Sequence, residues 1–169
     1  MVNGGAGVRG RVGGVLGVAV GLFALGCESQ WESSRIEYCK ELDLLQSDVR
    51  QRIGAIGAAT AAIGQLSPES QRDACAITDR DLRVLGATLE GFSRAAHVLA
   101  RGRAEGESVE DAGFVLTFGA DAVQGYDRKL CDAGQYEAAA KSVATIGKAV
   151  DDALARGRDR CQAAAQPTK

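Results

Sequence analysis

The cysteines are the side chains of this sequence with the most evident chemistry. Five occur among its 169 residues. They are Cys27, Cys39, Cys75, Cys131 and Cys161. No two of them form a Cys-x-x-Cys pair, which excludes the zinc, thioredoxin-like and c-type haem motifs that need one. Cysteines this far apart are suited instead to joining distant parts of the chain as disulfides, or to lying buried as free thiols.

The other residues that could do chemistry are one histidine and three acidic pairs. His97 is the only histidine, and it lies beside Ala96, a residue of a predicted apolar seam, so we expect it on a flanking, partly exposed surface. The acidic pairs are Glu41/Asp43, Glu110/Asp111 and Asp151/Asp152. Helical residues one or two apart do not face each other, so these carboxylates should not converge. The sequence therefore predicts no enzyme, no metal and no cofactor.

The first 26 residues differ in composition from the rest of the chain. They contain Arg9, Arg11 and no acidic residue, and residues 12–25 form an apolar, glycine-containing stretch. A helix needs about 20 residues to cross a bilayer, so this stretch is too short to span one. It fits the apolar region of a secretory signal peptide. Without the two arginines the net charge falls from −2 to −4, which argues against nucleic acid as a partner.

The signal segment ends on the sequence Phe23-Ala24-Leu25-Gly26-Cys27. This resembles the bacterial lipobox, in which a small residue precedes an invariant cysteine. Gly26 and Cys27 match, whereas Ala24 stands where the family most often has Leu, and Leu25 where a small residue is usual. The resemblance implies cleavage before Cys27, a thioether from its sulfur to diacylglycerol and acylation of the new amine. Two or three acyl chains would hold the protein stably to a membrane.

The resemblance also implies a location. Glu28 follows the cysteine in place of the Asp that resembles an inner-membrane retention signal, which favours the outer membrane in a cell with two membranes. The alternatives to a lipoprotein signal in this segment are an ordinary signal peptide and an uncleaved N-terminal anchor. We expect a cell-envelope protein that faces the periplasm or the surface. In an oxidising compartment the four cysteines other than Cys27 would form two disulfides.

Four segments of the mature chain have apolar residues at steps of three and four, which is typical of amphipathic helices. The predicted helices span about 32–65, 68–101, 109–131 and 135–161. Aromatic residues make up only 5% of the chain, which also favours helices over a β-sandwich. The remaining predictions are a signal peptide at 1–26, a lipidated residue and short tether at 27–31, a helical domain at 32–161 and a disordered tail at 162–169.

The predicted helix ends carry capping residues. Ser67 offers an N-cap ahead of Pro68 at the first helical position. Ser108 with Asp111 resembles a capping box, with Asp in place of the preferred Glu. Residues 132–134 form a short, glycine-containing turn.

Short connections make successive helices antiparallel, so we predict an all-α, up-down-up-down four-helix bundle. Cys39 and Cys161 then lie at one end, and Cys75 and Cys131 at the other. The predicted disulfides are Cys39–Cys161 and Cys75–Cys131. Any other pairing would join opposite ends of helices about 40 Å long, whereas a disulfide allows roughly 4.4–6.8 Å between Cα atoms.

The second half of the first helix is rich in small residues: Gly54, Gly57, Ala58, Ala61 and Gly64. They indicate either tight packing within the bundle, which we favour, or a groove for a partner helix. The leading functional hypothesis is a non-enzymatic binding or scaffold module, held to the membrane by its lipid and bound to an envelope protein.

The alternative hypothesis is a carrier of a small hydrophobic ligand between the helices. A pocket of several hundred cubic ångströms would favour it. The residues predicted to line such a pocket are Leu85, Leu89, Phe92, Val123 and Tyr126. A filled seam with an exposed apolar patch would favour partner binding instead.

Overall fold

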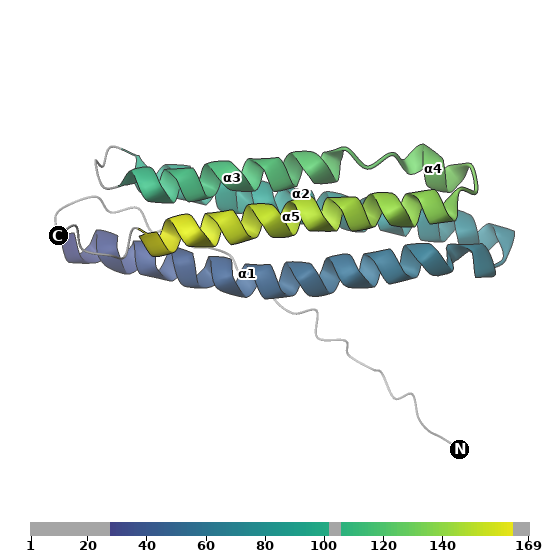
Figure 1. The fold of residues 1–169 in the computed structure, drawn as a ribbon, viewed down its shortest axis with the longest axis horizontal. Helices are drawn as coiled ribbons and strands as arrows, with labels where there is room; N and C mark the ends of the chain where they lie inside the picture. The colour runs from purple at the N-terminus through teal and green to yellow at the C-terminus, as the bar shows by residue number, and fades with distance from the viewer. Residues whose placement is uncertain (1–27, 102–105, 164–169) are drawn as a thin grey trace, which may run out of the picture.

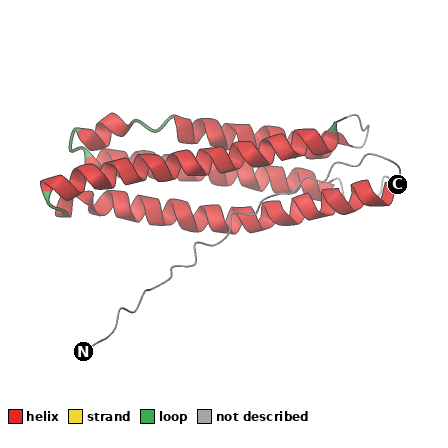
Figure 2. Cartoon of the chain, turned by 180° about the vertical axis from the view of Figure 1, so that it is seen from behind, coloured by secondary structure: helices red, strands yellow, loops and turns green. Residues whose placement is uncertain are grey.

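The computed structural model describes residues 28–101 and 106–163. The predictions for the signal peptide, for Cys27 and for residues 164–169 of the tail therefore lie outside the described residues. Residues 162 and 163, which were predicted to belong to the disordered tail, are helical instead. The elements are α1 (Glu28–Ala62), η1 (Ile63–Gln65), α2 (Pro68–Ala100), α3 (Glu107–Gln124), α4 (Arg128–Asp132) and α5 (Tyr136–Ala163). Four long helices lie side by side (Figure 1), and the described residues contain no strand (Figure 2). The all-α prediction is confirmed.

The four long helices form a ring around one core. α2 packs against α3, α3 against α5, α5 against α1, and α1 against α2. The largest side chains with almost no exposure come from each helix and include Leu42, Leu82, Leu89, Leu116 and Leu154. Each belongs to the predicted apolar seams. Burying a leucine fully contributes roughly 1.5–3 kcal/mol, so the seams supply the main driving force for assembly.

Two disulfides join the helices, as predicted. Cys39, near the start of α1, is bonded to Cys161, near the end of α5, with Cα atoms 5.7 Å apart. Cys75, near the start of α2, is bonded to Cys131 in α4, with Cα atoms 5.8 Å apart. The second disulfide lies in a small separate core with Ile63. The bonds thus hold two distinct apolar clusters.

Helix α1 begins at Glu28 and not at residue 32, so the residues predicted as a tether are helical from 28 onward. Trp31 and Tyr38 are each 7% exposed and belong to the core. Steps of seven and four residues connect them to Leu42, so the apolar seam simply continues backward along α1.

The predicted third helix is interrupted. α3 ends at Gln124, and a separate short helix, α4, begins at Arg128. Asp127 starts α4 because its carboxylate accepts a hydrogen bond from the Lys129 amide, 3.0 Å away. The interruption at residues 125–127 shows that the prediction of one helix over 109–131 was wrong. The apolar steps run through the break, so periodicity could not reveal it.

Other helix ends follow the predictions in part. The Ser67 hydroxyl accepts a hydrogen bond from the Ser70 amide at 3.4 Å, which confirms this N-cap. The Ser108 cap was wrong, because α3 starts at Glu107 and its N-cap is Gly106, which has no side chain to bond. Gly134 has a φ of 75° in the turn before α5, a conformation that favours glycine.

The helices were also compared with what a membrane-spanning helix requires. Among the helices of residues 28–101 and 106–163, none combines the length and the apolar character that crossing a bilayer requires.

Candidate functional site

The residues predicted to line a ligand pocket belong to the packed core. Leu85, Leu89 and Val123 are 2%, 0% and 3% exposed, and Phe92 and Tyr126 pack against the same cluster as partly buried residues. An exposure of 0% means that no water-sized space touches Leu89. The structure therefore brings these five side chains together as core neighbours, and leaves no space for a ligand against Leu89.

Tyr126 and Val123 also line a small pocket between α2 and α3, with Asp79, Leu82, Arg83 and Gln124. The Tyr126 hydroxyl is shielded from solvent and forms no hydrogen bond with the described residues. Burial raises the pKa of this hydroxyl, and the nearby Asp79 carboxylate raises it further. A ligand entering the pocket would not reach the shielded hydroxyl, so the hydroxyl offers no obvious binding group.

His97 lies on the surface, as predicted. Its side chain is 68% exposed, and its Nδ1 atom lies 2.9 Å from Oε1 of Glu110. This contact joins α2 to α3 on the exposed surface, where even a charged pair contributes only roughly 0–1 kcal/mol. His97 therefore lies in a surface contact between two helices.

The acidic pair Asp151/Asp152 does not converge, because Asp151 is engaged with α1. The Arg50 guanidinium binds its carboxylate through two nitrogens, with Nη2 3.0 Å from Oδ2. These hydrogen bonds hold the pKa of Asp151 below its usual value. Gln46 also donates to Asp151 at 3.5 Å and accepts from Arg158 at 3.2 Å. The cluster fixes α1 against α5 and has the character of a structural contact.

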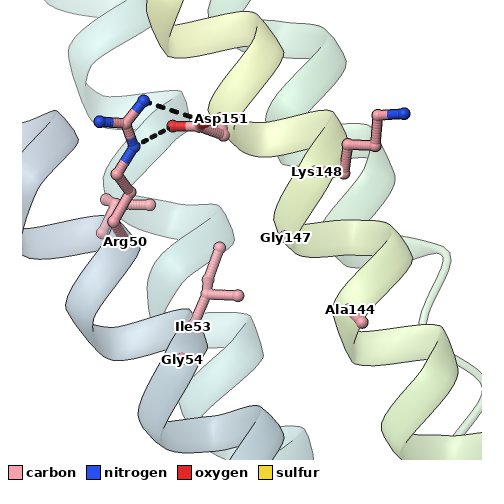
Figure 3. Close-up of a pocket in the computed structure, with 8 residues that line it drawn as sticks. Arg50, Ile53, Gly54, Ala144, Gly147, Lys148 and Asp151 are labelled. Atoms are coloured by element: carbon pink, nitrogen blue, oxygen red, sulfur yellow. Dashed lines mark hydrogen bonds and ion pairs between the residues drawn. The ribbon is translucent and has the colours of Figure 1, made fainter.

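A shallow groove lies beside this ion pair, between α1 and α5 (Figure 3). Ile53 lies in it and takes the space that the missing side chain of Gly147 leaves, since a Cβ on Gly147 would come within 2.6 Å of Ile53. Gly54 behaves differently, because a Cβ there would meet nothing within 4 Å.

The small residues of the predicted first helix differ in their surroundings, and one of them, Gly64, lies in η1 rather than in α1. A Cβ on Gly64 would lie 3.2 Å from the Tyr136 ring, and one on Gly57 would lie 3.8 Å from Val143. The predicted tight packing holds at Gly64, whereas the contact at Gly57 is an ordinary van der Waals contact. Gly54, Ala58 and Ala61 face solvent instead.

Among the described residues, the most exposed aromatic side chains lie on α3. Phe114 is 61% exposed and Phe118 is 47% exposed. Their rings meet edge to face with centroids 5.2 Å apart. The Arg156 guanidinium, from α5, lies 5.9 Å from the centroid of Phe118. We call Phe114 and Phe118 the α3 phenylalanine pair, and large apolar side chains grouped on a surface often mark a site of interaction.

Comparisons with protein-family models, curated proteins and solved structures find no match for this chain. No relative therefore assigns a role to any residue, and function is inferred from the chain's own side chains.

The sequence interpretation missed the α3 phenylalanine pair. Periodicity selects the residues that repeat with the core, such as Ala112 and Leu116, and Phe114 and Phe118 lie off that seam. The available signal was their mutual spacing of four, which places two large aromatic residues together on the solvent face of a helix.

Proposed function

We propose that this protein is an envelope lipoprotein, anchored through Cys27, that acts as a non-enzymatic binding or scaffold module. The lipobox resemblance supports the anchor. We also propose that the four long helices alternate in direction, up-down-up-down. This direction is supported by the disulfides, because each joins a cysteine near the start of one helix to a cysteine near the end of another element.

The observation that carries the proposal is the α3 phenylalanine pair on a bundle with a filled core. α3 packs against α2 and α5, and so does α1, which places α3 across the bundle from the helix that follows the anchor. The pair would therefore point away from α1, to the side of the bundle opposite the helix that follows the anchor, which favours a protein partner over the anchoring membrane.

Replacing both aromatic residues with serine is expected to weaken the binding of the partner protein. We expect the variant Phe114→Ser/Phe118→Ser to recover a specific envelope protein at least 10-fold less well than wild type. Aromatic anchors at interfaces commonly contribute 2 kcal/mol or more, and about 1.4 kcal/mol is tenfold in affinity. The measurement is quantitative mass spectrometry after cross-linking and purification from solubilised envelopes of the native host.

The matched control is Val84→Ser/Val98→Ser on α2, because these valines are similarly exposed, at 51% and 52%. Circular dichroism should show both variants folded. Equal recovery of every co-purified protein with the wild type and the phenylalanine variant would contradict the proposal.

The anchor is tested separately. Cys27→Ala is expected to move the protein from the membrane fraction to the soluble fraction and to abolish incorporation of labelled palmitate, because stable attachment requires the acyl chains. Fractionation and labelling in the native host provide the measurement, with Ser29→Ala as the control. A Cys27→Ala variant that stays in the membrane fraction would exclude lipid on Cys27 as the anchor.

A further inference from the structure

The outward face of α3 carries more than its phenylalanine pair. Helical steps of three and four place Glu107, Glu110, Phe114, Phe118 and Asp121 along one face. All five are exposed. We call these five residues the α3 strip. At a rise of about 1.5 Å per residue, the strip is roughly 21 Å long.

The charge of this helix has a single sign. Between Glu107 and Gln124, α3 contains four acidic residues and neither lysine nor arginine. Two of these acids are already engaged, since Glu110 contacts His97 at 2.9 Å and Asp111 lies 3.6 Å from Arg160. The acids at the two ends of the strip are Glu107 and Asp121, and neither forms an ion pair with any described residue. The pair of phenylalanines is thus flanked on both sides by a carboxylate that none of the described residues neutralises.

Arg156 is a cation that contacts one of the two aromatic rings. It lies over Phe118, and its Nε donates to the backbone oxygen of Asp152 at 3.2 Å. It therefore covers one ring from the α5 side, while the strip itself stays acidic at both ends.

We propose that the α3 strip binds a basic, apolar protein segment, in which apolar side chains pack on Phe114 and Phe118 and flanking lysines or arginines pair with Glu107 and Asp121. The inference rests on the proposed binding function and specifies its partner. Charge complementarity selects this occupant. An anionic lipid surface would be repelled by the two carboxylates, and a second α3 strip would bring like charges together, which costs free energy.

The test is photo-cross-linking in the native host, with p-benzoylphenylalanine replacing Phe114 in the full chain. The expected product joins residue 114 to a protein segment that has Lys or Arg within a few residues of the cross-linked site. Charge reversal by Glu107→Lys/Asp121→Lys should lower the yield at least 10-fold. Raising the salt concentration should also lower the wild-type yield, because solvent-exposed charges are screened.

The matched control is Glu37→Lys/Asp43→Lys. Both residues are exposed on α1, so the net charge changes equally while the α3 strip is unaltered, and the yield should stay at the wild-type level. Cross-links to lipid, to a second copy of this chain or to a segment without basic residues would each overturn the inference, as would a yield that charge reversal does not change.

The outcomes separate the two proposals. If Phe114→Ser/Phe118→Ser abolishes recovery of a partner but charge reversal has no effect, the binding function stands and the basic partner is wrong. If neither set of substitutions changes what is recovered, and residue 114 cross-links to nothing, both fail.

Discussion

Removing the disulfide between α1 and α5, as Cys39→Ala/Cys161→Ala, is expected to lower the free energy of unfolding by about 5 kcal/mol. The bond joins residues 122 positions apart in the chain. In the chain-entropy model a crosslink that closes such a long loop restricts the unfolded ensemble strongly. Guanidinium denaturation followed by far-UV circular dichroism gives the measurement.

The second disulfide provides the comparison. It spans 56 positions, so Cys75→Ala/Cys131→Ala should cost slightly less, about 4 kcal/mol. In dithiothreitol, the difference between the wild type and either variant should shrink to the small packing effect of the deleted sulfurs. A loss below about 1 kcal/mol in oxidised protein would contradict the entropic account. A non-reducing peptide map that joins Cys39 to Cys75 would contradict the fold itself.

The close contact of α3 with α2 at Gly113 is expected to make this position intolerant of any side chain. A Cβ at Gly113 would lie 2.4 Å from the Ala96 Cβ and 3.0 Å from the Ser93 carbonyl oxygen. Neither atom belongs to a flexible side chain, so α2 and α3 must move apart. We expect Gly113→Ala to cost about 2 kcal/mol, within the range for overpacked cores. Urea denaturation and the melting temperature would record the loss.

The same substitution at Gly54 should have the opposite effect. A Cβ there meets nothing within 4 Å, and alanine is favoured over glycine in a helix by roughly 0.8–1 kcal/mol. Gly54→Ala should therefore raise the melting temperature. A gain in stability for both variants would mean that α2 and α3 lie farther apart than described, and a loss for both would mean that the space beside Gly54 is not open.

The fold was largely predictable because burial imposes a period on the sequence. Residues such as Val49, Leu82 and Val150 repeat with their helices and are buried. The cysteine pairs followed from the order of the helices. Of the three ways to join four cysteines in two bonds, only one places both cysteines of each bond at the same end of the predicted bundle. The break after Gln124 was not predictable in this way, because a short helix after it keeps Leu130 packed against its neighbours.

The proposed binding surface was less predictable, because no packing rule constrains a residue that faces solvent. Phe114 and Phe118 lie off the apolar seams, whereas Leu85 and Leu89 lie on one and were candidate lining residues only under the alternative hypothesis of a ligand carrier. The structure shows that Leu85 and Leu89 are core residues. Apolar character alone does not distinguish a side chain that fills the core from one that lines a cavity, since both repeat with the same period.

The bond between Cys39 and Cys161 has a mechanical consequence. Tension applied at the start of α1 can unravel only the residues that precede Cys39 before it meets a covalent link to α5. Within that short stretch, Trp31 and Tyr38 would have to leave the core first. Beyond it, the load divides between two helices, so α1 cannot be peeled from the bundle alone. The domain would resist being pulled apart from its N-terminal end.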